Sequence, residues 1–185
     1  MKQLLLAMSL LLLAGVAYAG PIVEMKTNLG VIQIELNEEK APQTVTNFLT
    51  YVDQKFYDGT IFHRIIGNFM IQGGGYDQNE KRKETLDPIP NEAANGLNNR
   101  RGSISMARTN AVDSATSQFF INLVDNNSLD HHGTTPRGFG YAVFGQVISG
   151  MDVVDKIGKI KTIAKSSLFR NYPEPQVIIE SVRRL

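Results

Sequence analysis

Short runs in which apolar and polar residues alternate follow one another along most of the chain. From Ile32 to Leu36 every second residue is apolar, and Gln33 and Glu35 occupy the positions between, which predicts a half-buried strand over Val31–Leu36. Other short runs are rich in β-branched and aromatic residues and are bounded by turn-forming residues. They predict further strands at Ile22–Lys26, Thr60–Ile66, Phe69–Gln72, Gly102–Ala107, Ser117–Asn122, Phe139–Val147 and Val177–Val182.

Two segments have helical spacing instead. The first begins at Pro42, because proline suits the first turn of a helix. Its apolar residues recur at i, i+3, i+4 and i+7 and form one stripe that is expected to face the core: Val45, Phe48, Leu49 and Val52. The second helix follows Gly150 and ends at Gly158, with Val153, Val154 and Ile157 expected to face inward.

The segments between these elements are polar or contain small residues, and they predict loops. The longest are Asp77–Pro90, Asn110–Thr116, Asp125–Arg137 and Lys159–Pro175. Many strands, two helices and evenly spread turns favour a mainly β protein built as a closed antiparallel barrel. Strand periodicity alone does not separate a barrel from a sandwich. No repeat or composition shift divides the chain, so 20–185 is expected to be a single domain.

Composition narrows the classes of partner and site. The 185 residues are 42% hydrophobic and carry a net charge of +1, which gives no sign of electrostatic binding to nucleic acid or to an anionic membrane. The chain has no cysteine, which excludes disulfides, thiol catalysis and cysteine-ligated metal sites.

The first nineteen residues have the features of a secretory signal peptide. Lys2 supplies a positive charge, Leu4–Val16 is apolar, and Ala17-Tyr18-Ala19 is an A-x-A cleavage site. We expect cleavage to leave a mature chain that begins at Gly20, is exported to the periplasm and has no membrane attachment. A retained membrane anchor is the alternative, although the apolar run is short for a membrane span.

One charged residue stands inside an apolar run. Arg64 lies between Phe62 and Ile66, and an unpaired charge among apolar side chains is costly unless it has a purpose. Alternation along the strand predicts that these three residues share one face. Gln72 lies on the following strand, so two hydrogen-bond donors are expected beside apolar Phe69 and Met70.

A second run has the same character, because Gln118 and Phe120 share the parity of one strand face. Together, the runs F-H-R-I-I-x-x-F-M-I-Q-G-G (Phe62–Gly74) and S-Q-F-F-I (Ser117–Ile121) resemble the cyclophilins. The resemblance extends from Ile22 to the C-terminus. Gly73–Gly75, Met106–Thr109 and Phe139–Gly145 are most similar to the periplasmic cyclophilins of Gram-negative bacteria.

This resemblance implies an eight-stranded barrel with a helix over each end, and peptidyl-prolyl cis/trans isomerase activity without a cofactor or metal. It implies a catalytic role for Arg64, with Gln72 orienting it and bonding a substrate carbonyl. It implies an apolar proline socket made by Phe69, Met70, Phe120 and Leu129. It also implies a substrate-binding surface that includes His63, Ala107, Arg108, Gln118 and Tyr141.

The expected partners are proline-containing segments of unfolded or folding exported proteins. The protein itself is expected to be a monomer. The alternative is a chaperone module that binds proline segments and turns them over only incidentally. Three positions depart from the best-known eukaryotic cyclophilins: Gly67 replaces a proline, Ser128 a tryptophan, and Tyr141 a histidine at the pocket edge.

Other chemistry has little support in the sequence. The glycines at 73–75 are not followed by the G-K-[ST] of a phosphate-binding loop. Ser117 does not lie in the G-x-S-x-G motif of a serine hydrolase. His131 and His132 are adjacent but have no patterned carboxylates beside them, so a surface position is favoured over a metal site.

Overall fold

The computed structural model describes residues 20–185, and the predicted signal peptide lies outside the described residues. Within 20–185, eight antiparallel strands close a barrel in the order β1-β10-β3-β4-β6-β5-β7-β2. This confirms the predicted fold class. The barrel strands are β1 (Ile22–Thr27), β2 (Gly30–Leu36), β3 (Thr60–Ile66), β4 (Met70–Asp77), β5 (Ser103–Met106), β6 (Phe119–Asn122), β7 (Val143–Ser149) and β10 (Val177–Arg184).

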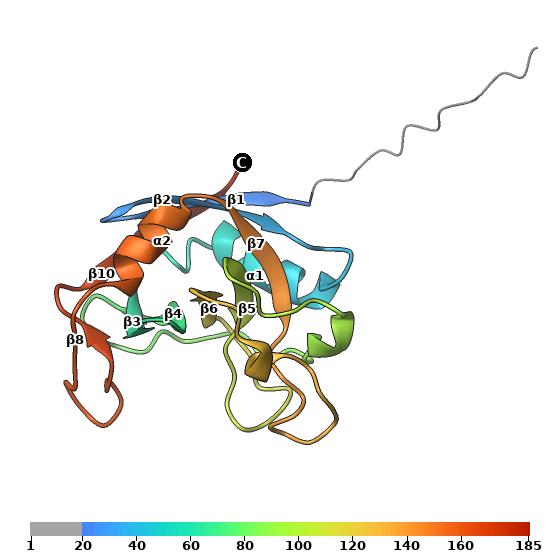
Figure 1. Ribbon diagram of the computed structural model, residues 1–185. Helices are drawn as coiled ribbons and strands as arrows, with labels where there is room; N and C mark the ends of the chain where they lie inside the picture. The colour runs from blue at the N-terminus through green and yellow to red at the C-terminus, as the bar shows by residue number, and fades with distance from the viewer. Residues whose placement is uncertain (1–19) are drawn as a thin grey trace, which may run out of the picture.

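The remaining elements of residues 20–185 lie around the barrel (Figure 1). They are the helices α1 (Pro42–Asp53) and α2 (Met151–Gly158), the short 3₁₀ turns η1 (Ala93–Asn95) and η2 (Asn127–Leu129), and a hairpin of β8 (Thr162–Ile163) and β9 (Tyr172–Pro173). Neither helix of residues 20–185 has the length and apolarity needed to span a membrane.

The core joins inward-facing strand residues to both helices. The predicted stripe of α1 is buried, and its Phe48 ring lies 5.1 Å from Tyr57, 5.8 Å from Phe119 and 5.2 Å from Phe144. In α2, Val154 and Ile157 are buried in the same core. Burial of one such side chain contributes about 1.5–3 kcal/mol, so apolar burial is the main reason that the barrel closes around these residues.

Several boundaries differ from the sequence prediction. Strand β4 continues to Asp77, beyond the predicted end at Gln72, and β7 begins at Val143, later than the predicted Phe139. The predicted loop Lys159–Pro175 contains the hairpin β8–β9, whose strands of two residues each are too short to give a periodic pattern. Phe169 and Tyr172 of this segment bury themselves against Ile61 and Tyr76 on the outside of the barrel.

The predicted shared face of Phe62, Arg64 and Ile66 is wrong, because β3 contains a bulge. Phe62 pairs with Gly73 and Arg64 pairs with Gln72, so two steps along β3 match one step along β4. A bulge of this kind shifts the alternation by one residue. As a result Phe62 packs in the core, while Arg64 points to the outer face.

The glycines of β4 permit a second irregularity in the same pair of strands. Gly74 has a φ of 80°, and a Cβ there would come within 2.8 Å of the Phe119 ring and 2.9 Å of the Tyr57 ring. A Cβ at Gly75 would meet the Gln118 side chain at 2.6 Å. The glycines of β4 therefore allow the Phe119 and Tyr57 rings and the Gln118 side chain to pack directly against the main chain of this strand.

The N-terminus of α1 is capped from a distant part of the chain. Its N-cap residue, Ala41, has no side-chain hydrogen bond to offer. Instead the Glu92 carboxylate accepts hydrogen bonds from the main-chain N–H groups of Gln43 (3.1 Å) and Thr44 (2.8 Å) and from the Thr44 hydroxyl (2.7 Å). A negative charge here also suits the positive end of the helix dipole.

We expect Glu92→Ala to lower the free energy of unfolding by about 1–2 kcal/mol, because α1 loses its cap. Denaturant unfolding followed by circular dichroism measures the change. Glu84→Ala, which removes an exposed carboxylate from the loop after β4, is the matched control and should have almost no effect. Equal stability of the two variants would contradict the capping role.

Candidate active site

The site is built on two adjacent rows of residues that cross the barrel strands. The inner row consists of Ile65, Ile71, Ile121 and Ile104, which pair in register across β3, β4, β6 and β5 and are at most 1% exposed. The outer row consists of Arg64, Gln72, Phe120 and Ser105, each paired with the next across the same strands. Since neighbouring strand residues face opposite sides, the inner row fixes the outward direction of the outer row.

Hydrogen bonds connect the polar members of the site. The Arg64 guanidinium Nη1 lies 3.4 Å from Gln72 Oε1, and Gln72 Nε2 donates to Gln118 Oε1 at 3.0 Å. All three side chains are partly exposed. The two glutamines therefore hold Arg64 at the surface without neutralising its charge.

The charge of Arg64 is partly desolvated. Burial lowers the pKa of Arg64 from its ordinary value, while the nearby Tyr141 acts in the opposite direction. None of the ion pairs found within residues 20–185 includes Arg64. Hydrogen bonds to a charged donor are stronger where water is partly excluded, so a substrate acceptor can interact strongly with this guanidinium.

A group of apolar side chains adjoins Arg64 and Gln72. Phe120 is buried within this group, with the Tyr141 ring packed edge-on at a centroid distance of 5.6 Å. The Tyr141 main-chain N–H donates to the Leu129 carbonyl at 3.0 Å, which brings Leu129 to the same place. Met70 is buried beside this group, and Phe69, half-buried, precedes it in the β3–β4 turn.

Ala107 and Arg108 border the site through main-chain contacts. The Ala107 N–H donates to the Gln118 carbonyl at 2.9 Å. Arg108 donates from Nε to the Gly140 carbonyl (2.9 Å) and from Nη2 to the Pro136 carbonyl (2.6 Å), and its guanidinium lies 4.8 Å from the centre of the Tyr141 ring. Arg108 thus joins the loop between β5 and β6 to the loop between η2 and β7, and the two loops lie side by side at the lower edge of Figure 1.

His63 occupies a different environment from Arg64. It is 6% exposed, and its ring lies 4.8 Å from Tyr76 and 6.3 Å from Phe169. Within residues 20–185, no hydrogen-bond partner is found for its Nδ1. The structure therefore packs His63 into the outer aromatic cluster, and its predicted contact with substrate stays a prediction.

Burial, together with the adjacent Arg64 charge, lowers the pKa of His63 to about 4 from its ordinary value of 6.5. Above pH 6.5 the His63 side chain is neutral in both the folded and the unfolded protein. Between pH 6.5 and 4 only the unfolded chain binds the proton, so falling pH favours unfolding by up to about 1.4 kcal/mol per pH unit.

We expect the free energy of unfolding of the wild type to fall by this amount relative to that of His63→Phe as the pH is lowered. The phenylalanine keeps an aromatic ring but does not bind a proton. The comparison uses denaturant unfolding of both proteins at intervals from pH 7 to pH 4.5, so that every other titrating group cancels. Parallel stability curves for the two proteins would contradict a neutral, buried His63.

No group of three metal-ligating side chains of the histidine, cysteine, aspartate or glutamate type is found in the part of the chain that the structure describes. His131 Nδ1 bonds to the Phe139 carbonyl at 2.9 Å, and His132 Nε2 bonds to the Asn127 carbonyl at 2.8 Å. Each histidine thus has a main-chain partner.

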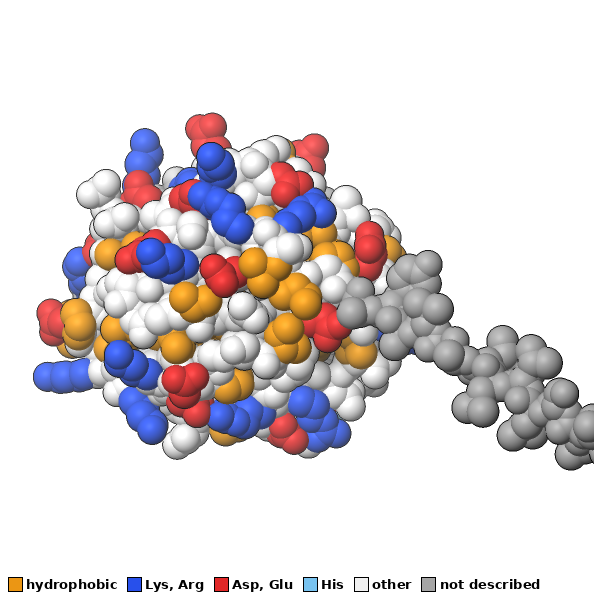
Figure 2. All heavy atoms as spheres, turned by 90° about the horizontal axis from the view of Figure 1, so that it is seen from above, with side chains coloured by type: hydrophobic (Ala, Val, Ile, Leu, Met, Phe, Trp, Pro, Cys, Tyr) orange, Lys and Arg blue, Asp and Glu red, His pale blue; other side chains and the backbone are white. Residues whose placement is uncertain are grey.

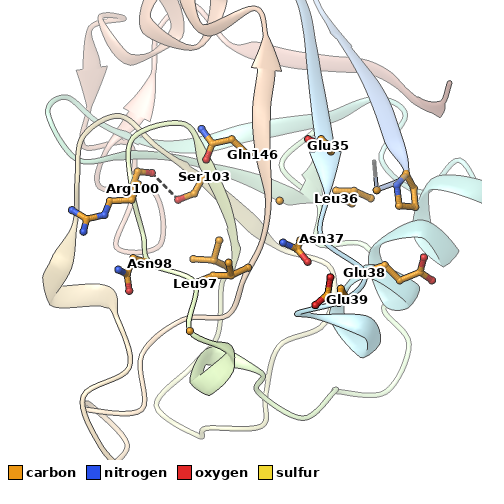
Figure 3. A pocket seen from close by; sticks show the side chains of 15 residues that line it. Glu35, Leu36, Asn37, Glu38, Glu39, Leu97, Asn98, Arg100, Ser103 and Gln146 are labelled. Carbon is orange, nitrogen blue, oxygen red and sulfur yellow. Dashed lines mark hydrogen bonds between the residues drawn. The ribbon is translucent and has the colours of Figure 1, made fainter. Parts of the chain in front are cut away.

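A hollow with a volume of about 850 Å³ lies elsewhere on residues 20–185. Figure 3 shows it between the end of β2, with Glu38 and Glu39, and the segment that carries Leu97 and Arg100. It shares no residue with the predicted site.

The face shown in Figure 2 has acidic and basic side chains interspersed, without a large patch of one sign.

A group of polar residues near Phe120 was not predicted from the sequence. Asn99, Asn122, Asn126 and Asp130 are all at most 9% exposed. One signal was present, because Asn122 has the same strand parity as Phe120 and so shares its outer face. The positions of the other three depend on how the irregular segments fold over β5 and β6.

Comparison with known proteins identifies the family. The sequence profile described as cyclophilin type peptidyl-prolyl cis-trans isomerase/CLD matches residues 22–184. A peptidyl-prolyl cis-trans isomerase of Acinetobacter baylyi is 54% identical over 99% of this chain and 95% of that protein. Peptidyl-prolyl cis-trans isomerase B of Escherichia coli is 53% identical over 87% of this chain and 98% of that protein.

Solved structures agree with this result. A cyclophilin type peptidyl-prolyl cis-trans isomerase of Cryptosporidium parvum matches with a TM-score of 0.73 and 26% identity, over 89% of this chain and 97% of that one. A second structure of that protein, determined in the presence of the dipeptide Ala-Pro, matches with a TM-score of 0.72. The chain therefore belongs to the cyclophilin family, and it is a peptidyl-prolyl cis-trans isomerase, as predicted. Cyclophilins bind proline-containing peptides as substrates.

Proposed function

We propose that this isomerase accelerates rotation about X-Pro bonds in exported polypeptides, with Arg64 as the catalytic donor. The proposal is supported by a half-buried guanidinium that is held by a neutral amide beside a group of apolar side chains around Phe120. This combination gives one strong donor and one surface for a proline ring.

The chemistry requires no bond to break. The barrier is the lost amide resonance, about 18–20 kcal/mol. In the twisted state the imide nitrogen regains a lone pair, and a donor aimed at it stabilises that state more than either planar isomer. A thousandfold acceleration requires about 4 kcal/mol of such differential stabilisation. A charge-assisted hydrogen bond in a partly desolvated site, added to a grip on the ring, can supply this amount.

The other predicted residues hold the substrate while the amide rotates. Phe69, Met70, Phe120 and Leu129 form the proline socket, with Tyr141 at its edge. Gln72 orients Arg64 and bonds a substrate carbonyl, and Ala107, Arg108 and Gln118 line the adjoining groove. His63 supports the strand that carries Arg64 and borders the substrate-binding surface.

We further propose that residues 1–19 are removed during export, and that the mature chain acts in the periplasm as a monomer on folding proteins. The support is the apolar run followed by Ala17-Tyr18-Ala19, together with the absence of cysteine. A cysteine-free protein suits an oxidising compartment, where a free thiol is a liability.

The direct test measures exchange of a short X-Pro peptide with the purified protein of residues 20–185. We expect Arg64→Ala to lower kcat/KM by about a hundredfold, because the guanidinium contact is worth about 3 kcal/mol in the twisted state. Arg64→Lys should recover only part of the rate, since a point charge lacks the planar fork. Treatment with EDTA should leave the parent rate unchanged.

Arg184→Ala is the control, because Arg184 is an exposed arginine that pairs with Asp53 at the end of β10. It should keep the parent rate. A parent-like rate in Arg64→Ala would remove Arg64 from the mechanism, and loss of activity with EDTA, restored by a metal, would show a metal requirement.

Refolding of an exported protein whose slow phase is limited by an X-Pro bond separates isomerase action from simple binding. We expect the parent to shorten the slow phase and Arg64→Ala to leave it nearly unchanged, because rotation is the limiting step. If Arg64→Ala raises the refolded yield as well as the parent does, the protein acts on that substrate as a proline-segment-binding chaperone, the alternative function.

A further inference from the structure

A network of buried polar side chains lies directly behind the proline socket. It occupies the outer face of β5 and β6, beside Phe120, and the segment from Leu123 to Ala142 covers it. Its members are Asn99, Ser103, Ser105, Asn122, Asn126 and Asp130, all between 0% and 9% exposed. None of the roles proposed for the socket residues involves this network.

Asn126 is the member that touches both walls of the socket. Its side-chain amide donates to the main-chain carbonyl of Phe69 at 2.9 Å, on one wall. Its main-chain carbonyl accepts the main-chain N–H of Leu129 at 2.9 Å, within the turn η2 on the other wall. Phe69 and Leu129 belong to segments far apart in the sequence, and Asn126 bonds to the first through its side chain and to the second through its main chain.

The rest of the network holds Asn126 in place. The second N–H of the Asn126 amide donates to Asn122 Oδ1 at 2.7 Å, and its main-chain N–H donates to the Asn99 carbonyl at 2.8 Å. Asn122 in turn donates to Ser103 Oγ at 2.9 Å and to Asn99 Oδ1 at 3.3 Å. Both donors of the Asn126 amide are therefore in use, and its orientation is fixed.

The network closes on itself beside Leu129. Asn99 donates from its main-chain N–H (2.6 Å) and its side-chain amide (3.0 Å) to one carboxylate oxygen of Asp130, the residue after Leu129. Ser105, which pairs with Phe120 across the strands, donates to Asn99 Oδ1 at 2.8 Å. A closed set of directional bonds resists sliding in a way that apolar packing does not.

We propose that Asn126 is a positioning residue, which sets the separation of the Phe69 and Leu129 walls and thereby the fit of the socket to a five-membered ring. This inference rests on the proposed role of those two residues as socket walls. A purely structural network would affect stability alone, whereas a network that sets the separation of the walls also affects the choice of ring.

The test compares Asn126→Ala with Asn47→Ala in the protein of residues 20–185. Asn47 is the matched control, because it is equally exposed at 8% and its amide also donates to a main-chain carbonyl, that of Thr116, at 2.7 Å. Each protein is assayed on two peptides, one with proline and one with its six-membered homologue, pipecolic acid. Melting temperatures are recorded for all three proteins.

We expect Asn126→Ala to lose about tenfold in kcat/KM on the proline peptide, because small displacements of positioning groups are costly. The preference for proline over pipecolic acid should shrink by at least about threefold, since one methylene in a fitted apolar pocket discriminates by tenfold or more. Asn47→Ala should lose stability but keep the parent kcat/KM and the parent preference.

The proposal is overturned if Asn126→Ala keeps the parent preference, whether its rates are unchanged or fall equally on both peptides. Should Asn126→Ala not fold, Asn126→Ser, which keeps a smaller donor, is judged by the same criterion. Arg64→Ala is assayed in parallel. If it is as active as the parent, the catalytic role of Arg64 fails, while the comparison of ring sizes still decides the role of Asn126.

Discussion

The register of one apolar row inside the barrel determines where the candidate active site lies. Ile65, Ile71, Ile121 and Ile104 meet across four strands in the barrel interior. A slip of one residue in any of these strands would turn an isoleucine outward, at a cost of about 1.5–3 kcal/mol for each side chain exposed. The same register places Arg64, Gln72 and Phe120 side by side on the outer face, so the packing of the core and the geometry of the site are one constraint.

The partner of Arg64 decides what its charge can do. Four other arginines of residues 20–185 bond to aspartates at the surface, where an ion pair contributes little to stability. Arg64 instead bonds to the neutral Gln72, which is fixed in turn by Gln118. A carboxylate in that place would neutralise the guanidinium, whereas the amide orients it and leaves its charge uncompensated.

Much of this arrangement could be predicted from the sequence. Alternation located the barrel strands, the helical stripe located α1, and the two motifs named Arg64, Gln72, Gln118 and Phe120, which the structure brings together. Alternation alone put Phe62 on the face of Arg64, because a bulge leaves no mark in an apolar run. The cap from Glu92 and the network around Asn126 depend on contacts between distant irregular segments, which carry no periodic signal.

We propose that the charge of Arg64, rather than its shape, stabilises the twisted amide. Replacing Arg64 with citrulline by chemical ligation tests this most directly, because citrulline keeps the length, the planarity and most of the donors but has no charge. The measurement is kcat/KM on an X-Pro peptide, with circular dichroism confirming the fold. We predict a loss of at least tenfold, since a charged donor adds about 1.5 kcal/mol or more over a neutral one. A citrulline protein as active as the parent would contradict this account.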